Sequence, residues 1–386
     1  MVMILKYVPG GLSCHSLRVS GQILYGRRIM HFTRGSQASI LGSFMAFAST
    51  LNPLRHLVQG IVPSISPSGG PCRTFEAFLA VVERQLHAFD LWCARHEKHI
   101  GLAQQGKYSS SHVVSLLSLK QKVTDNVAGI FVILLDTVRT IEVRRDRTNP
   151  STMSALILNT LLEAMRAAND TRTVKVLTDI WRESTEPLWT NLGKWLKDGI
   201  PIRLGFIDDH HKVAPTWDEK EFFIRINHLM DIGDPDFWDG GYTLPPRHTS
   251  TVLGMMDGHS EDEGCLPTFL AHVADHILAA GKAVGLLRAI NMIHLVGDDW
   301  LSSWLKFEDL TKTLPLEGLN GGLEDLISDT LLPPCRLVQS SLRQVLIEKC
   351  ELWKHLRGLE NVCLMTRGDA MSQFGEKLFT RVGIVS

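Results

Sequence analysis

The sequence predicts an all-α fold, an elongated array of packed helical bundles. Apolar residues recur three and four positions apart along most of the 386 residues, which is the period of a helix with one buried face. Stretches rich in glycine, proline and serine separate these segments, and only Glu221 to Ile226 reads as a short strand. With 44% hydrophobic and 21% charged residues, the composition is that of a globular protein and excludes a disordered or collagen-like chain.

The first clear helix is expected from Thr74, as its N-cap, to Gly101 at its end. The second covers His112 to Arg144, either as one long helix or as two helices that meet near Gly129. Each large apolar side chain on such a helix contributes roughly 1.5–3 kcal/mol when buried, so both must pack against neighbours. The apolar stripe of the first helix consists of Phe75, Leu79, Val82, Leu86, Phe89, Cys93, His96 and Ile100.

Three further helices are expected in the middle of the chain. One begins at Ser151 and ends at Asn169, and a shorter one is capped by Thr171. The third has Pro187 in its first turn and ends before Gly199, because proline favours helix starts and glycine favours helix ends.

A last helical stretch is expected to start behind Pro333 and Pro334. Its apolar stripe consists of Leu342, Leu346, Cys350, Trp353, Leu356, Leu359 and Cys363.

Charge is unevenly distributed along the chain, although the net charge is only −1. The first 75 residues hold seven Lys and Arg and no Asp or Glu, whereas residues 251–330 hold 13 acidic and 4 basic side chains. The near-zero net charge argues against nucleic-acid binding. The longest apolar run, Val127 to Leu135, is far shorter than the roughly 20 residues of a membrane-spanning helix. We therefore expect neither nucleic acid nor a membrane as a partner.

The N-terminal segment and the cysteines bear on location. Seven widely spaced cysteines without a C-x-x-C pair indicate reduced thiols in the cytoplasm. An acid-free, serine-rich start that contains arginine is also typical of a mitochondrial transit peptide, so a mitochondrial helical adaptor is an open alternative. Its densest basic group, Arg27, Arg28 and Arg34, is interpreted as a solvated face.

Few residue patterns suggest catalysis. His272 and His276 stand four positions apart, as metal-binding imidazoles do, but Val273 occupies the place where a metalloprotease carries its glutamate. A metal-dependent hydrolase that uses both histidines and a carboxylate such as Asp275 stays open as an alternative. A second polar group, Asp208, Asp209, His210 and His211, lies in an expected loop.

Phosphate and nucleophile motifs are also missing. Gly281 and Lys282 resemble the end of a phosphate-binding loop, but His276 and Ala283 stand where that motif requires glycine and a hydroxyl residue. Neither G-x-G-x-x-G nor G-x-S-x-G occurs in the sequence. We therefore expect a protein that is not an enzyme and that needs no cofactor.

Leu266 to Arg288 reads LPTFLAHVADHILAAGKAVGLLR and resembles a segment of the γ-tubulin complex component family. The order of further segments supports the resemblance, and the cluster of Phe237, Trp238 and Tyr242 is similar to the component-5-like branch. These segments are Tyr7–Leu17, Glu186–Ile200, Glu221–Asn227, Asp234–Leu244 and Leu356–Phe374. The motif positions that the resemblance assigns to structure or interaction are Phe237, Trp238, Tyr242, Leu266, Pro267, Phe269, Gly281, Lys282, Leu287, Gly368, Asp369 and Phe374.

The resemblance implies a structural subunit of a γ-tubulin complex that supports microtubule nucleation at spindle poles and microtubule organising centres. Residues 1–330 would be the N-terminal helical-bundle domain, which contacts sibling components laterally. Residues 331–386 would be the truncated start of the C-terminal domain that binds γ-tubulin. We accordingly expect a fragment that binds siblings well and γ-tubulin weakly, and that meets microtubule minus ends through the complex, in the cytoplasm and cytoskeleton.

Overall fold

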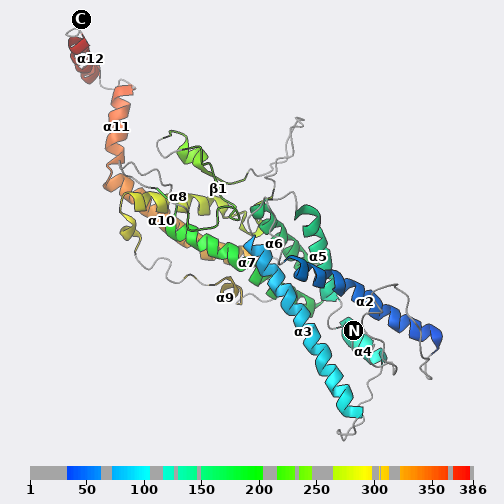
Figure 1. Cartoon of the computed structure of the whole chain (residues 1–386). Coiled ribbons are helices and arrows are strands. Elements are labelled where there is room, and N and C mark those ends of the chain that lie inside the picture. The colour runs from blue at the N-terminus through cyan, green and yellow to red at the C-terminus, as the bar shows by residue number, and fades with distance from the viewer. Residues whose placement is uncertain are drawn as a thin grey trace.

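A computed structural model of the chain confirms the all-α prediction and shows an elongated molecule (Figure 1). It describes residues 33–61, 72–104, 116–125, 129–145, 149–202, 215–230, 234–245, 264–297, 304, 306–312, 322–363 and 368–382. Several predictions lie outside these residues: the Tyr7–Leu17 segment, the proposed transit peptide, Arg27 and Arg28, and the polar group at 208–211.

Helices make up nearly all of the regular structure in the described part of the chain. They are α2 (Arg34–Ile61), α3 (Arg73–Gln104), α4 (Leu116–Val123), α5 (Gly129–Arg145), α6 (Pro150–Ala167), α7 (Thr171–Asp198), α8 (Ala274–Ala289), α9 (Phe307–Thr311), α10 (Gly322–Glu348), α11 (Leu352–Cys363) and α12 (Gly368–Val382). Shorter turns are the π-helix η3 (Phe237–Gly241) and the 3₁₀-helices η4 (Thr268–Leu270) and η5 (Ile293–Val296). None of the described helices is both long enough and apolar enough to cross a membrane.

Helix α7 is the centre of the molecule. It packs against α3, α6, α8 and α9, and α8 in turn packs against α10. One continuous apolar core extends from α2 through α7 to α10, and the fully buried Trp181 and Trp195 of α7 are its largest side chains. Helices α2, α3 and α4 lie toward one end of the molecule, whereas α11 and α12 project from the other (Figure 1).

A distant carboxylate caps helix α3. Glu221 is 1% exposed, and its two oxygens accept hydrogen bonds from the backbone N–H groups of Arg73 (2.9 Å) and Thr74 (2.7 Å). The Thr74 hydroxyl lies 2.9 Å from Ser154 Oγ of α6 instead. The prediction of Thr74 as N-cap is therefore wrong, and α3 also continues past Gly101.

The sequence left open whether residues 112–144 form one long helix or two. The structure has two, α4 and α5. Helix α5 begins at Gly129, as that arrangement requires. Helix α2, by contrast, was not predicted. Its sequence is rich in alanine, serine and glycine, which weaken the apolar period even though Leu51 and Leu54 are buried.

Helix α7 differs from the prediction at its start. Asp170, not Thr171, is the N-cap, because its carboxylate accepts hydrogen bonds from the backbone N–H groups two and three residues on, at 3.3 and 2.9 Å. The Thr173 hydroxyl, which also donates to this carboxylate, holds the pKa of Asp170 below its ordinary value, and the backbone hydrogen bonds add to the shift.

Helix α7 also runs unbroken through Pro187, where two helices were predicted. An internal proline costs roughly 3 kcal/mol, because it removes one helix hydrogen bond. Trp181 and Trp189 flank it on both sides, and each contacts Phe307 at 5.2 Å between ring centroids. Packing of both halves into one core thus offsets the cost, and the helix ends at Gly199 as predicted.

Pro333 and Pro334 lie inside α10 rather than ahead of a helix, so that prediction is also wrong. Leu331 and Cys335 on either side of them are fully buried and keep the helix continuous across residue 330. The chain then turns between α10 and α11 at Glu351, which has φ +46°. The predicted single stripe is therefore divided between two helices.

The predicted strand at 221–226 is mostly not a strand. Only Arg225–Ile226 forms β1, which pairs antiparallel with β2 (Tyr242–Thr243). The backbone N–H of Phe222 donates to Asp218 O at 2.9 Å, as in a turn. The apolar side chains ahead of β1 are buried in the core, so this segment carries large apolar residues for packing.

Candidate functional site

Five of the twelve motif positions, Phe237, Trp238, Tyr242, Gly281 and Lys282, meet around the C-terminal half of α7. The Trp195 cluster, as we call it, consists of Trp195, Trp217, Phe222, Phe237 and Tyr242. Trp195 contacts three of the other rings, at centroid distances of 4.9 Å to Trp217, 6.1 Å to Phe222 and 5.9 Å to Tyr242. Phe237 of η3 lies edge-on to Tyr242 at 6.0 Å. The cluster therefore ties α7, η3 and β2 into one aromatic core.

Gly281 lets α8 approach this cluster closely. A Cβ atom at Gly281 would lie 2.0 Å from Trp195 Cε2, and one at Gly285 would lie 2.3 Å from Ile200 Cγ1. In the space that the glycines leave, Trp195 Nε1 donates to Ile277 O at 2.8 Å, and the backbone N–H of Ile200 donates to Gly281 O at 3.1 Å. Gly281 is thus a contact surface for a tryptophan and does not cradle a phosphate.

Lys282 of α8 links this helix to η3 beside the Trp195 cluster. Its Nζ donates to the backbone oxygen of Trp238 in η3. Partial burial lowers the pKa of Lys282, and the nearby Asp239 carboxylate opposes this shift. Trp238 itself is 38% exposed, so its side chain lies partly at the surface. Its backbone oxygen is bound to α8 through Lys282.

Tyr242 is the one tyrosine in the described part of the site, and its environment changes its pKa. Burial, with a smaller contribution from Glu219, raises the pKa of Tyr242 to about 12. The phenol therefore stays protonated at neutral pH.

Phe269 belongs to a second aromatic group, with Trp181 of α7 and Phe307 of α9. Phe269 is 1% exposed and lies edge-on to Trp181 at 5.3 Å between ring centroids. Pro267 is buried and is the N-cap residue, directly ahead of η4.

Two residues of α7 hold α9 over this group. The Glu186 carboxylate accepts a hydrogen bond from the backbone N–H of Phe307 at 2.9 Å, and Arg182 donates to Thr311 O at 2.6 Å. Burial raises the pKa of Glu186, and the hydrogen bond from Phe307 opposes that shift. An acidic group thus faces the start of α9 and a basic group faces its end, which matches the helix dipole.

The remaining motif positions lie elsewhere. Leu287 is fully buried in a small cluster with Val338 and Val345 that joins α8 to α10. Gly368, Asp369 and Phe374 lie in α12, and Phe374 is exposed. Large exposed apolar side chains of the projecting α11 and α12 are Trp353, Leu356, Leu359, Phe374, Leu378 and Phe379.

The two histidines considered as metal ligands are not arranged as a metal site. His272 precedes α8, and its Nε2 lies 2.8 Å from Ser328 Oγ and 3.2 Å from Glu324 O of α10. His276 lies in the first turn of α8. Among the described residues, no three His, Cys, Asp or Glu side chains gather as metal ligands would, so the hydrolase alternative gains no support.

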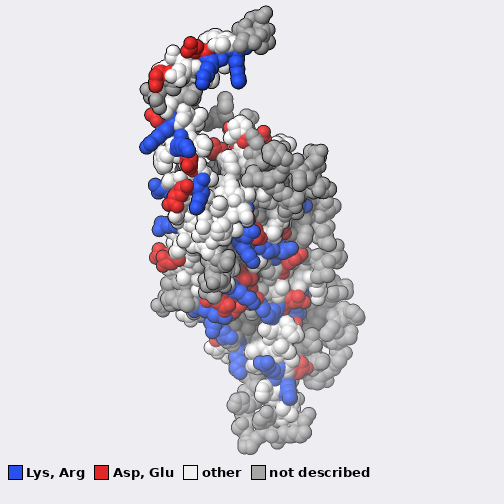
Figure 2. All heavy atoms as spheres, turned by 90° about the vertical axis from the view of Figure 1, so that its left-hand side faces the viewer, with Lys and Arg blue, Asp and Glu red and all other residues white. Residues whose placement is uncertain are grey.

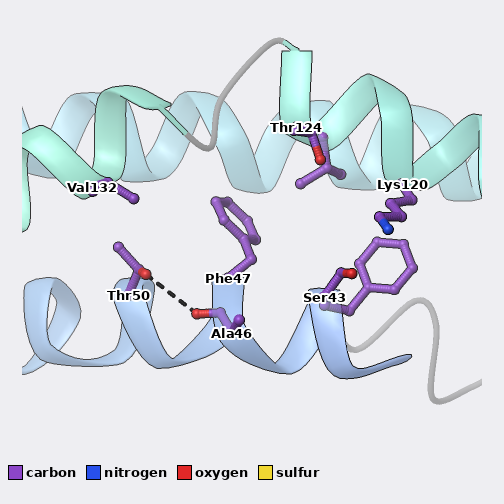
Figure 3. A pocket seen from close by; sticks show the side chains of 9 residues that line it. Ser43, Ala46, Phe47, Thr50, Lys120, Thr124 and Val132 are labelled. Atoms are coloured by element: carbon purple, nitrogen blue, oxygen red, sulfur yellow. Dashed lines mark hydrogen bonds between the residues drawn. The ribbon is translucent and has the colours of Figure 1, made fainter. Parts of the chain in front are cut away.

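A groove between α2, α4 and α5 is a further surface that the sequence did not predict. Phe47, Val132 and Lys120 face it from the three helices (Figure 3). Its volume is about 340 Å³. It is lined by Ser43, Phe44, Ala46, Phe47, Thr50, Lys120, Val123, Thr124 and Val132.

Charge on the side of the molecule seen in Figure 2 is mixed in sign. Lys and Arg side chains alternate with Asp and Glu over the described part of that face, including the projecting α11 and α12 (Figure 2). Such a mixture lacks the continuous positive stripe that a nucleic-acid backbone requires.

Comparisons with known proteins give consistent matches. Residues 9–349 match the protein-family model described as "Gamma tubulin complex component N-terminal". "Gamma-tubulin complex component 5" of Mus musculus is 24% identical over 297 residues, which cover 68% of this chain and 27% of that protein. The protein of that name from Macaca fascicularis is 23% identical over 292 residues, 67% of this chain and 37% of that protein. "Gamma-tubulin complex component 6" of Homo sapiens is 28% identical over 114 residues, 29% of this chain and 5% of that protein.

Proposed function

Because the chain belongs to the gamma-tubulin complex component family, we propose that it is a structural subunit of a gamma-tubulin complex. In this role it supports microtubule nucleation at spindle poles and microtubule organising centres, through lateral contacts with sibling components. The observation that carries the proposal is the family match over residues 9–349, which includes the whole α3–α10 body. The chain spans 27% and 37% of the length of the two component 5 relatives that it matches, so its role concerns this part of the complex.

The interlocked packing of the body suits a positional role. Trp195 fits against Gly281 with no room for a methyl group, and α7 passes through the core without a break. Close-packed interiors of this kind resist deformation. A row of such subunits can hold γ-tubulin molecules at fixed spacing, so that the entropy of bringing tubulins together is lost before nucleation begins.

The direct partners we propose are sibling components for residues 1–330. For residues 331–386, the expected start of the γ-tubulin-binding domain, we propose only a weak direct contact with γ-tubulin. The exposed apolar residues of α11 and α12 support a surface that another protein covers. Contact with microtubule minus ends is then indirect, and the location is the cytoplasm and cytoskeleton.

Co-purification tests the proposal directly. The full chain would be co-expressed with each sibling component in turn, with and without γ-tubulin, and the masses of the species measured by light scattering after size exclusion. We expect a stable complex with at least one sibling in the absence of γ-tubulin. We expect γ-tubulin alone to be retained weakly.

An unrelated helical protein of similar size serves as the negative control. A folded chain that stays monomeric with every sibling component would contradict the proposal. Complexes that form should also shorten the lag of tubulin polymerisation, and a complex with no effect on the lag would limit the role to assembly.

A further inference from the structure

We propose that α10 pairs antiparallel with α10 of a second copy of this chain, through a charged face that is complementary to itself. Asp325, Asp329, Arg336 and Arg343 form this face, and we call them the α10 charge stripe. The inference goes beyond the proposed function, which concerns sibling components. It uses a surface outside the Trp195 cluster and outside the motif positions.

The four charged residues lie along one line of the helix surface. At about 100° per residue, their directions around the helix axis fall within roughly 40° of one another. All four residues are exposed. The buried residues Ile327, Leu331 and Val338 lie on the opposite side of α10, where the helix packs into the body. The charge stripe therefore runs along the centre of the solvent face.

The other charged residues at α10 lie away from the stripe. Their directions are roughly 110–150° from its centre. These residues are Glu324, Glu348 and Lys349. Helix α8 and the turn ahead of it contact α10 through Ser328 and Gln339, roughly 70–90° from the centre. Within the described part of the chain, no ion pair involves a residue of the stripe.

The arrangement of these charges does not stabilise the single chain. Asp325 and Asp329 are four positions apart, where like charges repel each other along a helix. Asp329 and Arg336 are seven positions apart, about 10 Å along the axis, and do not pair. The helix dipole favours only Asp325 among the four, because its effect ends within the first and last turns. The stripe is therefore suited to opposite charges that come from outside the chain.

A second copy supplies these opposite charges, because the stripe changes sign at its middle. Its two carboxylates precede the Pro333–Pro334 pair, and its two guanidinium groups follow that pair. The midpoint between Asp325 and Arg343 and the midpoint between Asp329 and Arg336 both fall within about one residue of the prolines. A twofold axis at the prolines therefore places each carboxylate opposite a guanidinium group of the other copy, with an offset of about 2 Å along the axis.

The change of sign favours a second copy over other partners. A contact between identical surfaces requires this self-complementarity, whereas an acidic or a basic partner favours a stripe of one sign. The exposed Pro333 lies at the crossing point, where its short ring permits close approach. Leu337, 43% exposed and one turn further on, adds apolar area. Because exposed ion pairs are weak and screened by salt, the dimer should be reversible and sensitive to salt.

Sedimentation velocity of the full chain tests the pairing by charge reversal. In about 50 mM salt we expect a reversible dimer with a Kd of roughly 10–100 µM, which weakens at least about tenfold in roughly 0.5 M salt. One double variant combines Asp325→Arg with Asp329→Arg, and the other combines Arg336→Asp with Arg343→Asp. Each should weaken self-association about tenfold or more, because like charges then face each other.

An equimolar mixture of the two double variants is the sharpest sample. One variant has a wholly basic stripe and the other a wholly acidic stripe, so every opposed pair in a mixed dimer is attractive. We expect the mixture to dimerise with at least about the affinity of the wild type, although neither variant does so alone. A fluorescent label on one variant identifies the mixed dimer during sedimentation.

The controls reverse the same number of exposed charges on α5 and α6. They combine Glu142→Arg with Glu163→Arg, and Arg139→Asp with Arg166→Asp. Both controls should dimerise within about twofold of the wild type, because the stripe is intact. Far-UV circular dichroism and the thermal midpoint verify that every variant is folded.

Three outcomes would overturn the proposal. They are a wild-type chain that stays monomeric up to roughly 200 µM in low salt, a double variant that keeps the wild-type affinity, and a mixture that fails to restore the dimer. Equal losses in the stripe variants and in the controls would likewise assign the association to net charge rather than to α10.

Discussion

Trp195 keeps its position because α8 presents no side chain opposite it. At Gly281 a Cβ atom would overlap the indole ring at 2.0 Å, and the hydrogen bond from Trp195 Nε1 to Ile277 O fixes the ring in that place. Neither the ring nor the backbone can move without breaking a contact of the other. The identity of residue 281 therefore determines how closely α7 and α8 pack.

Gly281→Ala should destabilise the protein by about 3 kcal/mol, because an overpacked core must shift backbone or leave its rotamers. The matched control is Gly358→Ala in α11, where a Cβ atom would meet nothing within 4 Å. The control should be neutral or stabilise by roughly 0.5–1 kcal/mol, since alanine favours a helix interior. Urea denaturation followed by tryptophan fluorescence measures both, and equal effects would refute the contact argument.

Glu221→Gln should cost about 2 kcal/mol of unfolding free energy, because an amide replaces one of the two acceptors at the start of α3 by a donor. Glu76→Gln is the control, since it removes the same charge from the exposed first turn of that helix. We expect a loss no greater than roughly 0.5 kcal/mol for the control. Similar losses in chemical denaturation would show that charge alone, rather than the buried hydrogen bonds, stabilises the helix start.

At the scale of the element, helix starts depend on which oxygen reaches the free N–H groups. Helix α7 uses Asp170, whose pKa is lowered by its bonds to Thr173. A carboxyl with a lowered folded-state pKa stabilises the fold fully above its unfolded-state pKa. That contribution is lost as the pH falls through the lowered value.

Asp170→Ala should accordingly lower the midpoint of thermal unfolding at pH 7, and Thr171→Ala should not. The difference between wild type and Asp170→Ala should shrink as the pH falls below about 4, because the wild-type carboxyl then becomes protonated. Thermal scans between acid and neutral pH measure this. A difference that is constant with pH would contradict the capping role of the Asp170 carboxylate.

Periodicity in the sequence was sufficient to predict several elements. The apolar stripe of α3, the helix start at Gly129 and the helix end at Gly199 depend on neighbours in sequence, and the structure has them. The start of α3 and the continuity of α7 were predicted wrongly. They depend on Glu221 and on aromatic packing around Pro187, which no local pattern reveals.

The candidate site could be predicted only in part, because local sequence order identifies motif residues but does not reveal contacts between distant segments. Its motif residues were identified from their order in the sequence, and the convergence of some of them on Trp195 depends on contacts such as that with Ile277, 82 positions away. The groove was not predicted, because one of its walls is α2, and the small residues of α2 weaken the apolar period that would have predicted this helix.

At the scale of the whole molecule, apolar side chains are covered in the body and uncovered beyond it. Val345 of α10 is 2% exposed in its cluster with α8, whereas Leu356 and Leu359 of α11 are 43% and 59% exposed. The body therefore does not depend on α11 and α12 for its packing, and these helices present a surface for contacts with other molecules.

Leu356→Glu should leave the thermal midpoint of the body unchanged and should reduce self-association at high protein concentration. Val345→Glu, which places the same residue type in the covered cluster between α8 and α10, should destabilise the body by several kcal/mol, because it buries a charge. Sedimentation velocity and thermal unfolding separate the two effects. If Leu356→Glu unfolds the body, the projecting helices are part of its core.

The carboxylate that caps α3 has a consequence for synthesis. Thr74 leaves the ribosome 147 positions ahead of Glu221, so the first turn of α3 lacks its cap until that residue has been translated. At about 5–20 residues per second the delay is roughly 7 to 30 s. During that interval the nascent chain carries the open end of a long amphipathic helix, which makes this the stage at which a chaperone would have most to bind.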